Sequence, residues 1–257
     1  MKTCFAIVSA AFLAAVSSAS AAIVASDNGS NYGGGWTSGS NGGTGFGAWS
    51  FTSGGLAAKG NFIGNPGNIG ITGMGSSAFA LYANTGGSFT WNSNIPSITA
   101  SRSFGAALGI GDSFSMQWGI NWDTGGGSSS NKGFSLFAGA SEVINVNNGG
   151  NSDITVNGTN TGFGYGTNAM TWTFTQTTAT TVTVTANDRD GTGTYSAVIN
   201  VSGALSGLSI YATNMLGGSG AGNREPYYNN FTINAVPAPG AAALVGLAGL
   251  VGTRRRR

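Results

Sequence analysis

Strict alternation between apolar and polar side chains over residues 112–122 limits this part of the chain to a β-strand. The apolar row consists of Phe114, Met116, Trp118, Ile120 and Trp122, and the polar row of Ser113, Ser115, Gln117, Gly119 and Asn121. Successive side chains of a strand point to opposite faces of a sheet, so one row lies in a core and the other faces water. The pattern predicts a half-buried antiparallel strand with both tryptophans in the core.

Strand-like segments recur along the body of the chain, and no part of the body shows convincing helical periodicity. They are rich in β-branched and aromatic residues and are separated by Gly, Asn, Ser and Asp, which favour turns. The predicted strands cover residues 79–82, 88–91, 133–138, 143–146, 153–156, 171–176, 180–186, 194–201, 208–213 and 228–233. This spacing is typical of an antiparallel β-sandwich, and we expect residues 23–235 to form one all-β domain.

Residues 28–75 differ from the rest because glycine is dense there and aromatic residues interrupt it. The aromatic residues favour irregular loops and short edge strands that pack against the sandwich. A flexible linker is the alternative for residues 28–47 alone.

The composition excludes several classes of function. The chain has 257 residues, no histidine and one cysteine, so it has no Ser-His-Asp or Cys-His nucleophile and no His-ligated zinc. Five of the ten basic residues lie at the extreme ends, which leaves the body with five bases against eight acids and a net charge of −3. The body therefore lacks a nucleic-acid-binding surface, and we expect no nucleic-acid partner and no cofactor.

The first 22 residues have the pattern of a secretory signal peptide. A basic start is followed by an apolar run over residues 5–16 and by small residues up to Ala21 and Ala22, after either of which signal peptidase would cut. Cys4 would leave with this segment, so the mature protein would have no thiol and no disulfide.

The last 22 residues, 236–257, combine a proline-containing break, a short apolar helix and a basic stop. They resemble the tail of the PEP-CTERM family of bacterial surface proteins, which an exosortase in the membrane recognises. The matching residues are Pro237, Ala238, Pro239, Gly240, Arg254, Arg255, Arg256 and Arg257. The family has Glu where this chain has Ala238, so the resemblance implies a variant of the tag. It also implies transient anchoring in the membrane and then release to the cell surface, with the arginines on the cytoplasmic side.

Two other interpretations of residues 236–257 remain. The segment could pack on the domain as an amphipathic helix, although it has no polar face. It could also stay in the membrane as a permanent single-span anchor, although eleven apolar residues span only about 16 Å.

The body as a whole resembles concanavalin A-like jelly-roll domains. The residues that carry this resemblance are loosely similar segments at 45–49, 102–122 and 223–231. The resemblance implies the fold more than a function, because one fold can carry many kinds of site.

Two glutamates and one Asp-Thr-Gly triplet are the acidic groups to consider for catalysis. Glycoside hydrolysis needs two carboxyl groups about 5 to 9.5 Å apart, but Glu142 and Glu225 are distant in sequence and neither lies in a Glu-x-Asp-x-Glu run. The triplet at 123–125 matches aspartic proteases, whose mechanism needs a second aspartate, and the chain has no second triplet. We interpret the triplet as a loop and expect no catalytic residue.

The segment 187–191 resembles part of a Ca²⁺-binding loop, with Asp188 and Asp190 as weak candidate ligands. It joins two predicted strands and contains Asp-Gly, so a hairpin turn explains it without an ion. Ca²⁺ is therefore a secondary possibility.

The six tryptophans divide into two predicted groups. Trp118, Trp122 and Trp172 fall on apolar faces of strands, so we expect them in the core. Trp36, Trp49 and Trp91 lie in or near the glycine-rich region and are the candidates for a sugar-stacking surface.

These features together predict an exported, non-enzymatic β-sandwich sorted to the cell surface. Its expected role is structural or adhesive in an extracellular polysaccharide matrix, as the PEP-CTERM resemblance implies. A carbohydrate-binding module is the first alternative and predicts an exposed aromatic pair over a groove. A polysaccharide hydrolase is the second and predicts two converging carboxylates.

Overall fold

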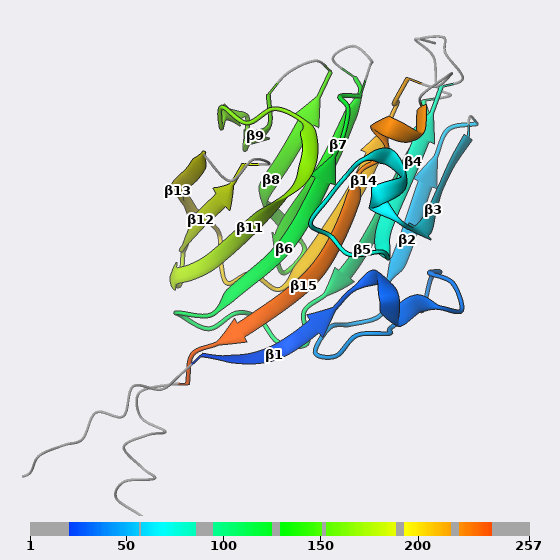
Figure 1. Ribbon diagram of the computed structural model, residues 1–257. Helices are drawn as coiled ribbons and strands as arrows, with labels where there is room; N and C mark the ends of the chain where they lie inside the picture. The colour runs from blue at the N-terminus through cyan, green and yellow to red at the C-terminus, as the bar shows by residue number, and fades with distance from the viewer. Residues whose placement is uncertain are drawn as a thin grey trace, which may run out of the picture. The chain divides into compact units, whose positions relative to one another are not determined.

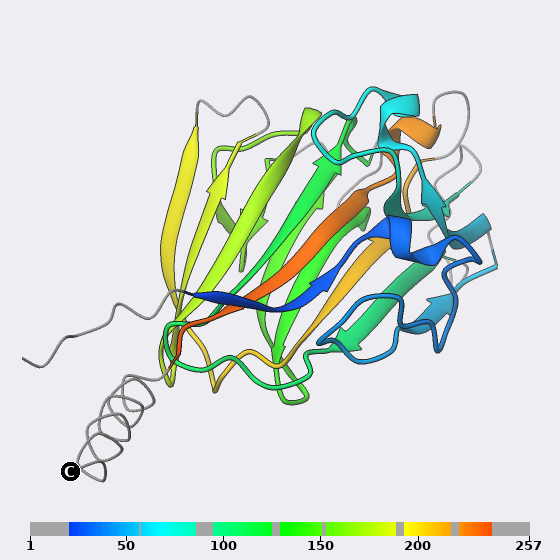
Figure 2. The same cartoon turned by 60° about the horizontal axis from the view of Figure 1, so that its bottom comes forward.

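The computed structural model describes residues 21–56, 58–85, 95–124, 129–150, 153–188, 193–216 and 221–237. Two antiparallel sheets pack face to face in these ranges, with three short 3₁₀ helices (Figures 1 and 2). The 3₁₀ helices are η1 (Gly29–Tyr32), η2 (Pro66–Ile69) and η3 (Ala221–Arg224). The prediction of an all-β antiparallel sandwich is confirmed. The predicted signal peptide, the predicted C-terminal helix and the predicted strand at 88–91 lie outside the described residues.

The first sheet has eight strands. Its order is β13 (Thr194–Asn200), β12 (Thr181–Asn187), β11 (Gly166–Thr178), β6 (Ser113–Ile120), β15 (Tyr227–Ala235), β4 (Ala78–Asn84) and β3 (Ala58–Gly64), with β1 (Ala22–Asp27) also paired to β15. Because β4 pairs with the start of β15 and β1 with its end, both the first and the last strand belong to this sheet.

The second sheet has seven strands. Its order is β10 (Thr159–Asn160), β9 (Thr155–Val156), β8 (Ser141–Gly149), β7 (Asn131–Ala138), β14 (Gly207–Thr213), β5 (Ser97–Ser103) and β2 (Ser50–Gly54). Strand β5 was not predicted, because its inward row of Ile98, Ala100 and Arg102 includes a charged residue.

Large aromatic side chains from both sheets fill the core. Trp118 of β6 meets Phe134 of β7 across the sandwich, with ring centroids 5.5 Å apart and nearly perpendicular planes. Tyr228 of β15 also crosses the sandwich, where its hydroxyl donates to the backbone oxygen of Gly133 at 2.8 Å. Trp172 is fully buried, so the core prediction for Trp118 and Trp172 is confirmed.

The glycine-rich segment is folded against the core. Trp36 and Phe46 are only 3% and 5% exposed, so the flexible-linker alternative for residues 28–47 is wrong. Strands β2 and β3 lie at sheet edges, as expected for this region. Residues 65–77 cover part of the outer face of the first sheet, where Ile71 and Met74 pack with Tyr227.

Candidate functional site

Several strand ends and connections meet at one end of the sandwich, drawn uppermost in Figure 1. Strand β6 ends at Ile120, opposite Gly166 at the start of β11, and Tyr227 at the start of β15 pairs with Gly119. We call this end, with residues 121–124, 161–165 and 221–226, the loop end. It carries the candidate site.

An exposed tryptophan packs beside a half-buried tyrosine at the loop end. The Trp122 side chain is 47% exposed, and its ring lies 5.7 Å from that of Tyr165, centroid to centroid, at an interplanar angle of 36°. The prediction that Trp122 lies in the core is wrong, because β6 ends two residues earlier and alternation no longer applies. Tyr165 is half-buried and packs against the core, so the loop end has one exposed ring beside a partly covered one and not the exposed pair that a carbohydrate-binding module predicts.

Lys132 of β7 lies behind this pair and is fully buried. Its ammonium donates to three backbone oxygens, those of Trp122, of Asp123 at 3.3 Å and of Arg224 at 2.7 Å. Burial lowers the pKa of Lys132 to about 7, while the charge of Asp123 raises it. One side chain thus fastens the loop of Trp122 to the segment that precedes β15.

Glu225 follows Arg224 in that segment and is half-buried. Burial raises the pKa of its carboxyl to about 7. Burial and the charge of Glu225 together raise the pKa of Tyr227 to about 12. The loop end therefore holds an acid and a base that both titrate near neutral pH.

The Asp-Thr-Gly segment begins in the loop directly after Trp122. Thr124 is fully buried, and its hydroxyl donates to the backbone oxygen of Gly150 at 3.2 Å. These contacts agree with a structural turn at Asp123 and Thr124. The other glutamate, Glu142, is exposed at the start of β8, at the opposite end of the strands from Glu225.

The tryptophans predicted for a ligand surface are buried instead. Trp36 is 3% and Trp49 1% exposed, and the two rings pack edge to face at 5.3 Å. The prediction for both is therefore wrong, because the glycine-rich segment folds over them. Trp91 lies outside the described residues.

A buried ion pair holds this segment in place. Asp27 of β1 pairs with Arg102 of β5, and both side chains are completely buried. Asp27 also accepts from the hydroxyl of Tyr32 at 2.6 Å, and Tyr32 accepts from the indole nitrogen of Trp49 at 3.0 Å. The guanidinium lies 4.7 Å from the centre of the Trp49 ring. We call Asp27, Tyr32, Trp49 and Arg102 the N-terminal lock.

The candidate Ca²⁺ ligands lie in the predicted hairpin. Strands β12 and β13 pair antiparallel up to Asn187 and Thr194, and Asp188 donates its backbone N–H to the oxygen of Gly193 at 3.0 Å, so the hairpin prediction is confirmed. Asp190 lies outside the described residues. Among those described, no three His, Cys, Asp or Glu side chains gather as a metal site would need.

The chain was compared with protein families, with curated proteins and with solved structures. No family model and no curated protein matches the chain. Among solved structures, the polysaccharide lyase family 7 alginate lyase AlgAT5 has 13% identity and a TM-score of 0.38, covering 62% of this chain and 79% of its own. The VIP36 exoplasmic/lumenal domain bound to Ca²⁺ and Man3GlcNAc has 10% identity and a TM-score of 0.40, covering 74% and 84%. The CBM2 module of the evolved Dit of Lactobacillus casei BL23 phage J-1 has 11% identity and a TM-score of 0.39, covering 73% and 90%.

Likeness at this level carries no argument about function or ligand. The helices in the described part of the chain are too short to cross a membrane.

Proposed function

We propose that this chain is an exported, surface-sorted protein that binds extracellular polysaccharide without catalysis, in a structural or adhesive role. The observation that carries the proposal is the exposure of Trp122 beside Tyr165 at the loop end. Flat aromatic rings offer the apolar face of a sugar a large contact area at low entropic cost. We further propose that the two-sheet sandwich is a jelly roll of the concanavalin A-like type.

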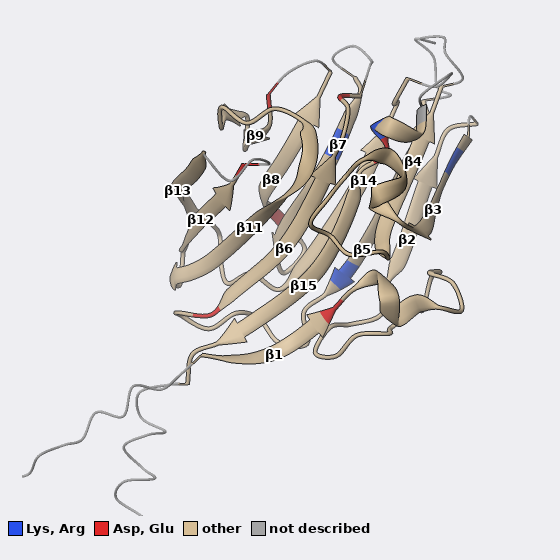
Figure 3. Cartoon of the chain, in the orientation of Figure 1, with Lys and Arg blue, Asp and Glu red and all other residues tan. Residues whose placement is uncertain are grey.

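The surroundings of Trp122 suit a rigid binding surface. Lys132 fixes the backbone of Trp122 through a hydrogen bond to its carbonyl oxygen, so the loop that carries the ring is held without support from a ligand. Preorganisation of this kind lowers the entropy lost on binding. In the part of the chain that the structure describes, the loop end has a buried cation and a half-buried acid but no large basic patch (Figure 3), which favours an uncharged polymer over an acidic one.

Binding can be tested with the mature domain and insoluble or soluble neutral polysaccharides. We expect Trp122→Ala to lower affinity at least tenfold while changing the free energy of unfolding by less than about 0.5 kcal/mol. Ile110→Ala is the matched control, because Ile110 is an exposed apolar residue, 67% accessible, away from the loop end. Equal affinity of Trp122→Ala and wild type would exclude the loop end as the binding surface.

A polysaccharide hydrolase is the second candidate, favoured by Glu225. A carboxyl group with a pKa raised to about 7 can stay protonated and act as a general acid. The ammonium of Lys132 also joins the segment of Glu225 to that of Asp123, which could supply a second carboxylate. Release of reducing ends by the wild type, lost in Glu225→Gln, would favour hydrolysis; binding without release would favour the non-catalytic role.

Export and sorting are supported by where the two terminal segments join the sandwich. Ala22 at the start of β1 pairs with Ala235 at the end of β15, so the first and last strands of the described residues lie side by side (Figure 1). Cleavage after Ala21 would keep β1 whole, and removal of residues 236–257 would leave β15 whole. Signal peptidase and an exosortase-like enzyme are the proposed partners, and a cell-surface or extracellular location follows.

The intact mass of protein recovered from the cell surface tests this processing. We expect the loss of about 22 residues at each end, as the two predicted signals require. If every surface-exposed molecule retains Arg257, cleavage of the tail is excluded and a permanent anchor becomes the better account.

A further inference from the structure

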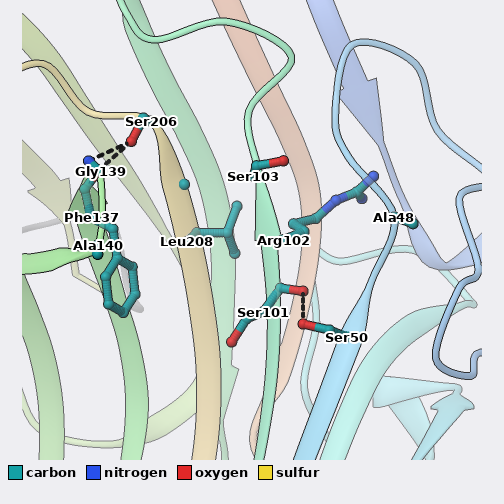
Figure 4. Close-up of a pocket in the computed structure, with 11 residues that line it drawn as sticks. Ala48, Ser50, Ser101, Arg102, Ser103, Phe137, Gly139, Ala140, Ser206 and Leu208 are labelled. Atoms are coloured by element: carbon teal, nitrogen blue, oxygen red, sulfur yellow. Dashed lines mark hydrogen bonds between the residues drawn. The ribbon is translucent and has the colours of Figure 1, made fainter.

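A hollow lies on the outer face of the seven-stranded sheet. It encloses about 500 Å³ and is open to solvent. Its lining comes from strands β2, β5, β7 and β14 and from the turn after β7 (Figure 4). Phe137 lies five residues after Lys132 along β7, which is roughly 17 Å of extended strand, so the hollow is far from the loop end.

The missing side chain of Gly207 opens this hollow. Gly207 pairs with Ser103 on one side and with Phe137 on the other. Side chains at paired positions of a sheet point to the same face, so Ser103 and Phe137 flank a position that has none. The hollow therefore has Phe137 on one side of Gly207 and Ser103 on the other.

Phe137 has no structural role that explains its position. It points outwards from β7 and is half-buried, whereas Phe134, three residues earlier, is completely buried in the core. Phe137 belongs to neither apolar cluster of the described residues and contacts no other described aromatic ring. Its ring gives the hollow an aromatic surface that can contact the apolar face of a ligand.

Serine side chains also line the hollow. No hydrogen bond of the Ser101 hydroxyl is seen among the described residues, so it can bind a ligand, whereas the Ser103 hydroxyl points away from Phe137 (Figure 4). Ser206 is fixed, because it accepts from the backbone N–H of Gly139 at 2.8 Å. The hollow thus combines one free hydroxyl with one that is held rigid.

The charges around the hollow disfavour an anion. Arg102 is part of the lining, but its guanidinium turns into the sandwich, where it binds Asp27 and the backbone oxygen of Gly47. Glu142, the partner of Phe137 on β8, is exposed and places a carboxylate near the rim. An acidic sugar would meet repulsion here with no available cation to offset it.

We propose that this hollow is a second carbohydrate site, which takes one uncharged pyranose unit with its apolar face on Phe137 and its hydroxyls towards Ser101. The site does not depend on the loop end for any of its contacts. With both sites filled, one molecule bridges two polysaccharide chains, and the second attachment gains from effective concentration.

Calorimetric titration with short neutral oligosaccharides of glucose, mannose and galactose tests this proposal, with oligo-alginate as the anionic comparison. We expect two sugars bound per wild-type protein, one in Trp122→Ala, one in Phe137→Ala and none in the double variant. Ser101→Leu, which fills the hollow but leaves Phe137 in place, should match Phe137→Ala. Thermal unfolding checks that each variant is folded.

The outcomes separate the two sites. A wild-type stoichiometry of one that Phe137→Ala leaves unchanged overturns the second site but keeps the loop end. A stoichiometry of one that Trp122→Ala leaves unchanged, but Phe137→Ala abolishes, supports the second site and overturns the loop end. Binding of oligo-alginate as tight as that of neutral sugars, or no binding of any neutral sugar, overturns the ligand class and with it the proposal.

Discussion

The N-terminal lock and the loop end each combine a buried cation with an aromatic residue, but the aromatic residue is buried in the lock and exposed at the loop end. In the lock, the buried cation Arg102 meets a carboxylate and an aromatic ring, and all of these groups are inside the protein. At the loop end, the buried cation Lys132 binds only backbone oxygens, and the Trp122 side chain on that backbone stays 47% exposed. Arg102 binds side chains and also the backbone oxygen of Gly47, all inside the protein, whereas Lys132 binds only backbone oxygens and leaves the Trp122 side chain free for a ligand.

Breaking the lock should have the largest effect on stability. Asp27→Ala leaves the Arg102 guanidinium buried without its carboxylate, and we expect a loss of about 3–5 kcal/mol in the free energy of unfolding. Urea unfolding of the mature domain measures it.

The double variant Asp27→Leu/Arg102→Met is the control, because it removes both charges and keeps apolar volume. It should be more stable than Asp27→Ala. A loss below about 1 kcal/mol in Asp27→Ala would mean that the lock is not what holds the glycine-rich segment.

Removing the cation of the loop end should have a smaller effect. Lys132→Met deletes a charge that is itself unfavourable to bury but leaves buried carbonyl oxygens without a donor, so we expect a loss of about 1–3 kcal/mol. Lys59→Met is the matched control, since Lys59 also donates to one backbone oxygen, that of Gly55 at 2.7 Å, but is only half-buried on the edge strand β3. Equal losses in the two variants would show that Lys132 has no special role.

The strands could be predicted because the pattern that forms them is local. Alternation of large apolar side chains was enough for β6, β11, β12 and β14, whose inward residues are buried. Strand β5 cannot be predicted in this way, because its inward-facing Arg102 is tolerated in a core only beside Asp27, which is 75 residues away. A charge whose partner comes from a distant strand gives no signal in a local window.

The candidate site could be predicted less well, for a related reason. Whether a tryptophan is exposed depends on where its strand ends and on what covers it. Trp122 is exposed because its strand ends before it, and Trp49 is buried because the glycine-rich segment covers it. The loop end also depends on Lys132, whose acceptors come from Trp122 and Asp123, at most 10 residues away, and from Arg224, which is 92 residues away. One signal was available: Asn121 and Asp123 flank Trp122 and favour a turn over a strand.

The last expected effect is a dip in stability near neutral pH, which arises at the loop end. The pKa of Glu225 is raised by burial to about 7, so between pH 4.5 and 7 the native state keeps a proton that the unfolded chain has released, and stability falls as pH rises. The pKa of Lys132 is lowered to about 7, so between pH 7 and 10.5 the unfolded chain holds the extra proton, and stability rises with pH.

Thermal unfolding between pH 5 and 9.5 should therefore give its lowest Tm near pH 7. Glu225→Gln should remove the slope on the acid side and Lys132→Met the slope on the alkaline side, while Asp27→Leu/Arg102→Met should keep both. A profile without a minimum in the wild type, or a minimum that survives in both loop-end variants, would mean that these two groups do not titrate as their burial requires. The persistence of both slopes in the lock variant would assign the titration to the end of the sandwich that presents Trp122.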